Sequence, residues 1–262
     1  MTVKRYFLGI DVGSTASKCV IIDEDKRIAA SVVIPVGTGT TGPARAFAAA
    51  CEEAGIREED LACITATGYG RNTFEKADRT VSELSAHALG VHTLYPEAKT
   101  VIDIGGQDAK AIRIGSNGRL ENFIMNDKCA AGTGRFLEVM ARILERDVSE
   151  LGTMDKEAEG TVAVSSTCTV FAESEVISQL ARGVDIKSLV RGIDESVAVR
   201  TAGLVKRLGV IDPVIMTGGV AANAGVVSAL EYELGTEITV SSIAQQNGAF
   251  GAAVYGLQKT VR

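Results

Sequence analysis

The sequence predicts an α/β protein made of two similar lobes. Three observations support this prediction: an internal repeat at a constant offset of 92 positions (103 − 11), an apolar strand followed by an Asp-x-Gly turn in each copy, and a globular composition with 46% apolar and 23% charged residues. A chain of 262 residues is long enough for two lobes that share a large interface. We expect residues 1–95 to form the first lobe and residues 96–247 the second, with a C-terminal helix at 248–262 that packs back onto the first lobe.

The repeat extends well beyond the Asp-x-Gly turns. Asp11 aligns with Asp103, and the same offset continues without a gap. The other aligned pairs include Gly13 with Gly105, Lys18 with Lys110, Arg27 with Arg119, Thr41 with Thr133 and Gly42 with Gly134. Each copy therefore predicts a run of strand, turn, strand, turn and strand, followed by a helix that begins near Pro43 or Arg135.

The two turns suit a phosphate group. The apolar strand at 101–104 ends beside Gly105 and Gly106, and glycines let backbone N–H groups approach an anion closely. A carboxylate such as Asp103 can face a phosphate only if a cation such as Mg²⁺ lies between them. A strand followed by two glycines is more often a simple hairpin, so the phosphate interpretation depends on the repeat. Two such lobes would place one phosphate-binding turn on either wall of a cleft.

The elements of the first lobe follow in order. Residues 6–36 predict a three-stranded meander, residues 44–53 a helix ended by Gly55, and residues 61–67 a fourth strand.

A helix at 80–94 carries both histidines. Because His87 and His92 are five residues apart, they do not share a helix face and make a poor metal site. We expect them to make surface or interlobe contacts, and Glu83 to be solvated.

The second lobe predicts further elements. Apolar positions between Phe136 and Leu144 indicate an amphipathic helix, and residues 161–164 indicate a strand that is followed by a helix ending near Ala181. A strand at 214–217 runs into a glycine pair and a helix at 224–233, and the pair could let an adenosine lie flat against the backbone.

Two of the five cysteines have a suggestive placement. Cys129 and Cys168 each lie in a loop of small and hydroxyl-bearing residues before a helix, where the helix dipole favours anionic sulfur. Two thiolates do not fill a four-sulfur metal site, but a two-fold dimer would supply 2 × 2 = 4. Two ordinary buried cysteines and a redox disulfide are the alternatives. Cys19, Cys51 and Cys63 fall within predicted elements, and we interpret them as small core residues.

The composition excludes several classes of partner. A net charge of −6 gives no electrostatic case for binding nucleic acid or an anionic membrane. The N-terminus runs into a strand without the apolar stretch of a signal peptide, and no later segment is apolar enough to span a bilayer. We expect a cytoplasmic protein, in which structural disulfides are rare.

The motifs resemble a known group of proteins. The segments GIDVGSTASKCVIID, VIDIGGQDAKAI and VIMTGGVAAN are similar to the phosphate 1, phosphate 2 and adenosine motifs of the actin, Hsp70 and sugar-kinase ATPase superfamily. The segments NDKCAAGTGRFLE and SSTCTVFAESEV resemble the two cysteine motifs of the activators of 2-hydroxyacyl-CoA dehydratases, which are grouped with the ATPase subunits of benzoyl-CoA reductases. The resemblance covers essentially the whole chain and is closest to the activators that serve 2-hydroxyglutaryl-CoA dehydratase.

This resemblance implies a fold, cofactors and partners. It implies duplicated actin-like (ribonuclease H-like) lobes around a central nucleotide cleft, with ATP or ADP and Mg²⁺ in each protomer. It further implies a homodimer that shares one 4Fe-4S cluster ligated by Cys129 and Cys168. A reduced ferredoxin or flavodoxin would donate electrons, and a separate dehydratase, component D, would accept them.

The resemblance also implies roles for single residues. Asp11 and Asp103 would position Mg²⁺ and its waters, and Gln107 is the first candidate for orienting the attacking water. Lys18 would contact phosphate or lie on the surface. The predicted cofactor-binding residues are Val12, Gly13, Ser14, Thr15, Ala16, Lys18, Gly105, Gly106, Gly218, Gly219, Asn223 and Gln245.

Two rival functions share the nucleotide motifs. A small-molecule kinase, of the type that acts on N-acetylglucosamine, needs a general base, and Asp108 is the only well-placed spare carboxylate. An ATP-dependent scaffold or chaperone needs a client-binding segment, which the sequence does not show. Neither rival explains the two cysteines.

Overall fold

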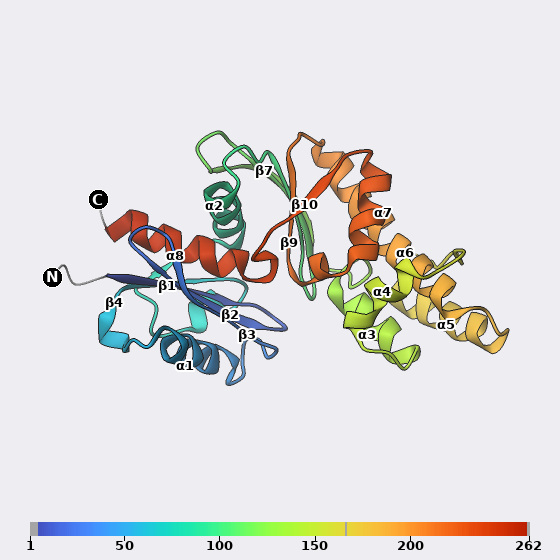
Figure 1. Ribbon diagram of the computed structural model, residues 1–262, viewed down its shortest axis with the longest axis horizontal. Coiled ribbons are helices and arrows are strands. Elements are labelled where there is room, and N and C mark those ends of the chain that lie inside the picture. Colours follow the sequence, from blue (N-terminus) through green and yellow to red (C-terminus); the bar gives the residue numbers. More distant parts are fainter. Residues whose placement is uncertain (1–4, 166, 261–262) are drawn as a thin grey trace. The chain divides into compact units, whose positions relative to one another are not determined.

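The computed structural model describes residues 5–165 and 167–260, drawn in Figure 1. The described residues divide into two compact units. The first unit draws on Met1–Ala98, Ile114–Glu121 and Gln245–Arg262, and the second on Lys99–Arg113 and Asn122–Ala244. Each unit is built on a five-stranded mixed sheet with helices packed against it, so the α/β class is confirmed.

The first sheet has the strand order β3-β2-β1-β4-β5. Strand β1 pairs antiparallel with β2 and parallel with β4. Its strands are β1 (Tyr6–Val12), β2 (Ser17–Asp23), β3 (Ile28–Ile34), β4 (Leu61–Thr67) and β5 (Arg79–Thr80). Helix α1 (Gly42–Ala54) lies on one face of this sheet, whereas α8 (Asn247–Thr260) lies on the other and packs against α2 (Glu83–Leu94). The last two residues of the helix expected at 248–262 lie outside the described residues.

The second sheet repeats the first. Its order, β8-β7-β6-β9-β10, matches that of the first sheet strand for strand. Its strands are β6 (Thr100–Ile104), β7 (Ala109–Ile114), β8 (Leu120–Asn126), β9 (Val214–Thr217) and β10 (Ile238–Val240). The offset of 92 holds in the structure, because β3 and β8 begin at 28 and 120 and the following helices begin at Gly42 and Gly134. The predicted duplication is therefore confirmed.

Five helices complete the second unit. They are α3 (Gly134–Ile143), α4 (Leu151–Lys156), α5 (Thr169–Ala181), α6 (Ile186–Leu208) and α7 (Ala224–Leu234). Fully buried side chains of β6, α3 and α6, such as Ile102, Phe136 and Ile193, form its core. Among the described residues, none of the helices is both long enough and apolar enough to cross a membrane.

Short 3-10 helices occupy several connections of the chain. They are Glu58–Asp60, Arg71–Thr73, Val148–Glu150, Gly219–Ala222 and Ala244–Gln246.

Some predicted boundaries were wrong for local reasons. Helix α2 begins at Glu83, not at residue 80, because Arg79–Thr80 pairs with β4 and the Ser82 hydroxyl caps the helix by accepting from the Ser85 N–H at 3.1 Å. The strand expected at 161–164 does not form, since the Val162 N–H donates to the Ser188 carbonyl of α6 at 3.1 Å.

A glycine in β1 lets α8 pack closely on the first sheet. A Cβ atom at Gly9 would overlap the backbone of Ala249 and Ala253 in α8. We therefore expect Gly9→Ala to lower the free energy of unfolding in urea by about 1–3 kcal/mol, the usual cost of overpacking. Gly203→Ala is the matched control, because its Cβ meets open space on α6 and should add up to about 1 kcal/mol through helix propensity. Equal stability of Gly9→Ala and the wild type would contradict the packing described.

Candidate functional site

The first predicted nucleotide turn begins at a buried ion pair. Asp11, at 5% exposure, lies opposite Lys18 in the β1–β2 register, and the Lys18 Nζ is 3.1 Å from the Asp11 Oδ2. Lys18 is therefore not a solvated surface residue. The Asp11 Oδ1 is buried and has no hydrogen-bond partner among the described residues. It lies beside Gly68, where a Cβ would overlap it. One carboxylate oxygen is neutralised and the other is open to a cation.

The turn after Asp11 is tight and partly open. The Gly13 N–H donates to the Ala16 carbonyl at 3.1 Å, and Ser14 at the tip of the turn is exposed. Val12 and Ala16 are buried, and Thr15 is half-buried. Gly37 packs against the back of this turn so closely that a Cβ there would overlap the Ser14 carbonyl.

The second turn repeats the ion pair in a more enclosed form. The fully buried Lys110 places its Nζ 3.1 Å from the Asp103 Oδ2 and 2.8 Å from the Asp108 Oδ2. The Asp103 Oδ1 accepts from the Thr217 hydroxyl at 2.8 Å. An ammonium group this deeply buried needs opposite charge close by, and the two carboxylates supply it. Both oxygens of Asp103 are thus engaged, in contrast to Asp11.

The glycine pair of the second turn is attached to helix α3. The Gly134 N–H donates to the Gly105 carbonyl at 2.9 Å, and the Arg135 N–H donates to the Gly106 carbonyl at 2.8 Å. The first amides of a helix have no partner within the helix, and here the turn provides one for each. Gln107, at the tip, is exposed. Two backbone hydrogen bonds therefore fix this turn to the start of α3.

The glycine loop after β9 has the expected backbone. Gly218 has φ +88°, and a Cβ there would overlap the Ile104 carbonyl, so only glycine fits. The loop continues through Gly219 to Asn223, whose side chain caps α7 by accepting from the Gly225 and Val226 N–H groups at 2.9 and 3.3 Å. The Asn223 side chain therefore fixes the end of the Gly218–Asn223 loop to the start of α7.

Gln245 is exposed and belongs to the first unit. His87 in that unit is buried, and its carbonyl accepts from the Asn247 side-chain amide at 3.1 Å, so the expected surface position is wrong for this histidine.

Cys129 and Cys168 are free and half-buried. The Asn126 side chain holds the Cys129 loop, because its amide donates to the Cys129 carbonyl at 2.8 Å and its oxygen accepts from the Cys129 N–H at 3.3 Å. Cys168 is itself the N-cap residue of α5. Helix α3 begins at Gly134, within one residue of the predicted start near Arg135, so Cys129 lies in the loop before it as expected.

Sequence reasoning missed Arg200, a residue of α6 that contacts both cysteine loops. Its aliphatic carbons lie against Gly132, where φ is +82° and the nearest side-chain carbon is 3.0 Å from the position of a Cβ. Its guanidinium donates to the Thr167 carbonyl, next to Cys168, at 3.5 Å. These partners are distant in sequence, so no local pattern could have identified them. Arg200 puts one positive charge between the two loops.

Two of the remaining cysteines, Cys19 and Cys63, are buried in the core, whereas Cys51 is half-buried. Burial raises the pKa of the Cys19 thiol well above its usual value, and burial also raises that of Cys51. Cys63 is 3% exposed. These surroundings suppress the thiolate form at Cys19 and Cys51 that a metal ligand requires.

Two known proteins are similar to this chain over nearly its whole length. The (R)-2-hydroxyglutaryl-CoA dehydratase activating ATPase of Acidaminococcus fermentans is 56% identical over 98% of this chain and 99% of its own length. The structure of the activator of the 2-hydroxyisocaproyl-CoA dehydratase from Clostridium difficile, with bound ADPNP, superposes with a TM-score of 0.96 at 53% identity, covering 98% of this chain and 96% of that one.

A more distant structure shares the fold alone. The ROK family glucokinase from Streptomyces griseus superposes with a TM-score of 0.61 at 15% identity over 97% of this chain and 99% of its own. Residues 8–256 match the model of a single family. The chain therefore belongs to the BadF/BadG/BcrA/BcrD ATPase family.

Proposed function

We propose that this protein hydrolyses ATP to drive low-potential electrons from an iron–sulfur cluster into a 2-hydroxyacyl-CoA dehydratase, and so activates that enzyme. The observation that carries the proposal is the pair of free thiols, Cys129 and Cys168, on loops that Arg200 connects within a chain 56% identical to a dehydratase activating ATPase. A reduced ferredoxin or flavodoxin is the proposed donor, and component D of the dehydratase is the proposed acceptor. We propose 2-hydroxyglutaryl-CoA dehydratase as the first acceptor to test and the cytoplasm as the location.

The Asp11 carboxylate suits a magnesium ion. Its Oδ1 is buried without a partner among the described residues, and hard cations prefer such oxygens. Bound Mg²⁺ would neutralise charge on the transferring phosphoryl group. Asp103, with both oxygens engaged, is better suited to orient waters than to ligate the ion directly. The residues proposed to meet phosphate are Gly13, Ser14 and Thr15 in the first unit and Gly105 and Gly106 in the second.

The Cys129 and Cys168 thiols suit a cluster shared between two chains. Both are half-buried, and one caps the N-terminus of a 13-residue helix, where anionic sulfur is favoured. The Arg200 guanidinium would offset part of the negative charge of a thiolate-ligated group. A 4Fe-4S cluster supplies one-electron transfer when bound, and two chains would contribute its four sulfurs.

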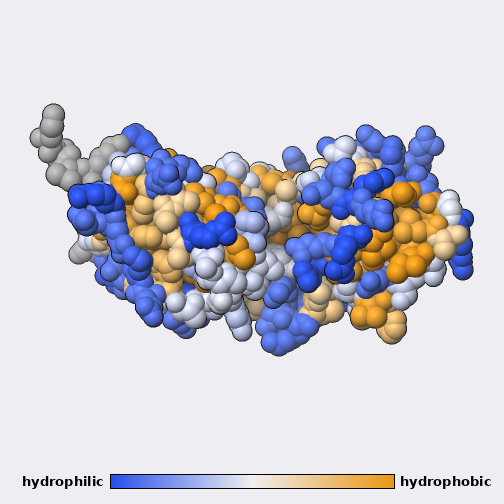
Figure 2. Space-filling view, turned by 90° about the horizontal axis from the view of Figure 1, so that it is seen from below, coloured by the Kyte–Doolittle hydropathy of each residue, from blue (hydrophilic) through white to orange (hydrophobic). Residues whose placement is uncertain are grey.

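Helix α5 offers a surface for the second chain. Val170, Phe171 and Ile177 are 65%, 68% and 51% exposed, although all three are large apolar side chains. They begin two residues after Cys168. Figure 2 shows apolar residues gathered on the part of the second unit that carries α5. Contiguous exposed apolar surface is typical of protein interfaces, and its position beside Cys168 favours a second copy of this chain.

The backbone supports a link between nucleotide and thiols. The turn at Gly105 and Gly106 is hydrogen-bonded to the start of α3, and the Cys129 loop leads into the same helix. A change in this turn on ATP hydrolysis would shift α3 and with it the Cys129 loop. Through Arg200 the shift would reach the loop of Cys168.

Gly134 lies at the centre of this link. A Cβ there would be 3.1 Å from the Gly105 carbonyl oxygen and 3.5 Å from the Val220 Cγ2. We expect Gly134→Ala to retain nucleotide binding and hydrolysis within a few-fold, but to activate less dehydratase per ATP hydrolysed. Gly160→Ala is the control, because its Cβ meets only the Ser188 hydroxyl, at 3.6 Å. If Gly134→Ala and Gly160→Ala activate equal amounts of dehydratase per ATP hydrolysed, the proposed link between the Gly105–Gly106 turn and the Cys129 loop is contradicted.

The kinase alternative is less supported. The general base it would require, Asp108, is paired with the buried Lys110 at 2.8 Å. The relatives with high identity are dehydratase activators.

The decisive experiment is anaerobic purification followed by iron and sulfide analysis, EPR of the reduced protein and light scattering. We expect a brown dimer with about two iron atoms per chain, since four irons are shared by two chains. A colourless monomer that hydrolyses ATP would overturn the proposal.

A further inference from the structure

Two carboxyl groups meet in the interior of the second unit. Asp194 of α6 is fully buried and Asp155 of α4 is 9% exposed. Both Oδ2 atoms face Gly225 at the start of α7, where a Cβ would overlap each of them. Among the described residues, the Asp194 Oδ2 has no conventional donor. Two ionised carboxylates this close repel strongly, so the pair is stable only if one of them holds a proton.

The surroundings decide which carboxyl group keeps the proton. Arg191 donates from Nε to the Asp155 Oδ1 at 3.2 Å and from Nη2 to the Asp155 carbonyl at 2.6 Å. Asp194 has no such cation. Burial, with the charge of Asp155 as the second cause, raises the pKa of Asp194 to about 8. Asp194 is therefore the member of the pair that holds a proton, and its carboxyl group is hydrogen-bonded to Asp155.

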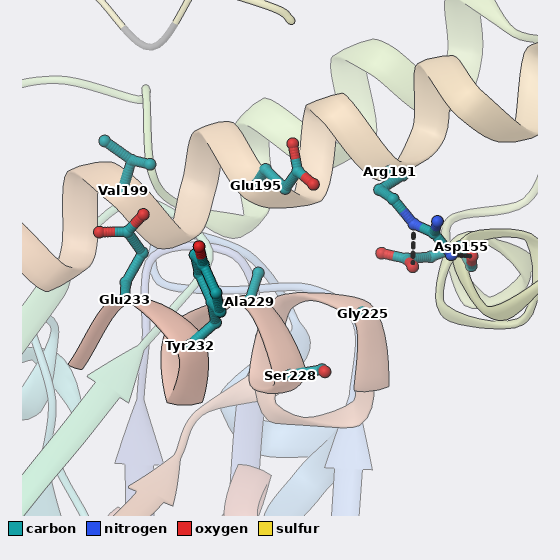
Figure 3. A pocket seen from close by; sticks show the side chains of 9 residues that line it. All are labelled: Asp155, Arg191, Glu195, Val199, Gly225, Ser228, Ala229, Tyr232 and Glu233. Atoms are coloured by element: carbon teal, nitrogen blue, oxygen red, sulfur yellow. Dashed lines mark hydrogen bonds and ion pairs between the residues drawn. The ribbon is translucent and has the colours of Figure 1, made fainter. Parts of the chain in front are cut away.

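A pocket of about 410 Å³ lies beside this pair and is lined by Asp155. Figure 3 shows Asp155 paired with Arg191 at its edge, with α6 and α7 forming its walls. The charged or titratable side chains that line this pocket are Asp155 from α4, Arg191 and Glu195 from α6, and Tyr232 and Glu233 from α7. Asp194 itself does not line the pocket and is fully buried.

The other oxygen of Asp194 reaches the glycine loop. Its Oδ1 accepts from the Asn223 side-chain amide at 2.9 Å. The Asn223 oxygen in turn accepts from the first amides of α7. Asn223 ends the segment that begins at Gly218. A chain of polar contacts therefore runs from Arg191 through the two carboxyl groups to this loop.

We propose that Asp194 is a positioning residue for nucleotide binding, and that its carboxyl group, held between Asp155 and Asn223, fixes the loop from Gly218 to Asn223 in the shape that receives adenosine. This inference rests on the proposed ATP site. Loss of the proton puts two negative charges side by side and removes the donor to Asp155. The repulsion from Asp155 displaces the Asp194 carboxylate, and the Asn223 amide that donates to it moves with it. The loop from Gly218 to Asn223 then departs from the shape that receives adenosine.

The test is the dissociation constant of ADP at pH 7 and pH 9 for the wild type and for Asp194→Asn. Asparagine mimics the protonated acid, because its amide donates to Asp155 and its oxygen accepts from Asn223. At pH 9 a group that titrates near 8 has lost about nine-tenths of its proton. We expect ADP affinity of the wild type to fall by up to about tenfold between these pH values. Asp194→Asn should show little change.

Two further variants separate positioning from folding. Asp194→Leu, which cannot hydrogen-bond, should bind ADP weakly at both pH values. Glu233 lines the same pocket and, among the described residues, its recorded ion pair is with Lys206 on the surface, so Glu233→Gln should follow the wild-type profile.

A second readout concerns stability alone. The folded chain holds the Asp194 proton to about pH 8, whereas the unfolded chain releases it near 3.8, so this group makes the folded state less stable as pH rises between these values. The urea midpoint should therefore fall with pH more steeply in the wild type than in Asp194→Asn.

The outcomes are distinct. An ADP affinity that is flat in the wild type, or that falls equally in Asp194→Asn, overturns the positioning role even if the stability profile behaves as expected. A wild type that binds no ADP at pH 7 refutes the proposed nucleotide site, and this inference with it.

Discussion

Cys129→Ala and Cys168→Ala are expected to hydrolyse ATP and yet fail to activate a dehydratase. Each removes one of the two sulfurs that a chain would contribute, so a dimer keeps only two of four ligands and cannot retain a four-iron cluster. The nucleotide turns do not include either thiol. The measurements are iron content and EPR after anaerobic purification, ATP turnover, and dehydratase activation with a chemical or protein reductant.

Cys51→Ala is the matched control for these variants. Cys51 is also half-buried, but it lies in α1 of the first unit, where burial raises its pKa. Its replacement should leave iron content and activation at wild-type levels. Normal activation by Cys129→Ala or Cys168→Ala would refute the cluster assignment, whatever the ATPase rate.

Asp11→Asn is expected to lose ATP hydrolysis by roughly a hundredfold or more, because a bound metal supplies several kcal/mol of charge stabilisation and each 1.36 kcal/mol is tenfold in rate. The substitution removes the charge of a buried carboxylate whose Oδ1 has no other partner among the described residues. The Mg²⁺ concentration at half-maximal ATPase should rise together with the loss of rate. Nucleotide binding measured without Mg²⁺ should change much less.

Asp103→Asn provides the comparison within the repeat. Its oxygen can still accept from Thr217, and Lys110 keeps its contact with Asp108. For Asp103→Asn we expect a lower ATPase turnover number than in the wild type. The rise in the Mg²⁺ concentration at half-maximal ATPase should be smaller than in Asp11→Asn. Asp25→Asn, in an exposed turn, is the neutral control. A wild-type rate and Mg²⁺ midpoint in Asp11→Asn would exclude Asp11 as a ligand.

The repeat made most of the fold predictable. A gapless offset relates the first three strands and the following helix of one copy to those of the other. The pairs Asp11–Lys18 and Asp103–Lys110 show that it reaches side-chain contacts, each with an N–O distance of 3.1 Å. The predicted repeat places both lysines opposite the aspartates in adjacent strands. Their burial as ion pairs was not evident from residue type alone.

Helix α6 shows where prediction from the repeat and from apolar periodicity fails. It lies outside the repeated segment, and the buried Asp194 interrupts its apolar pattern. The partners that explain this aspartate, Asn223 and Asp155, are 29 and 39 (194 − 155) positions away. The strand expected at 161–164 does not form for a related reason. The Val162 N–H donates to the Ser188 carbonyl of α6 instead of pairing with a strand. Contacts between distant, unrepeated segments leave no periodic signal.

The steric fit of Gly37 limits how the two halves of this chain can be recombined. Position 37 corresponds to Cys129 under the offset (129 − 92), yet any side chain there would overlap the Ser14 carbonyl. A chimera that transplanted the thiol-bearing loop into the first half would therefore force apart the very turn that its Asp-x-Gly motif forms. The first half can therefore receive that loop only if the turn behind position 37 is rebuilt as well.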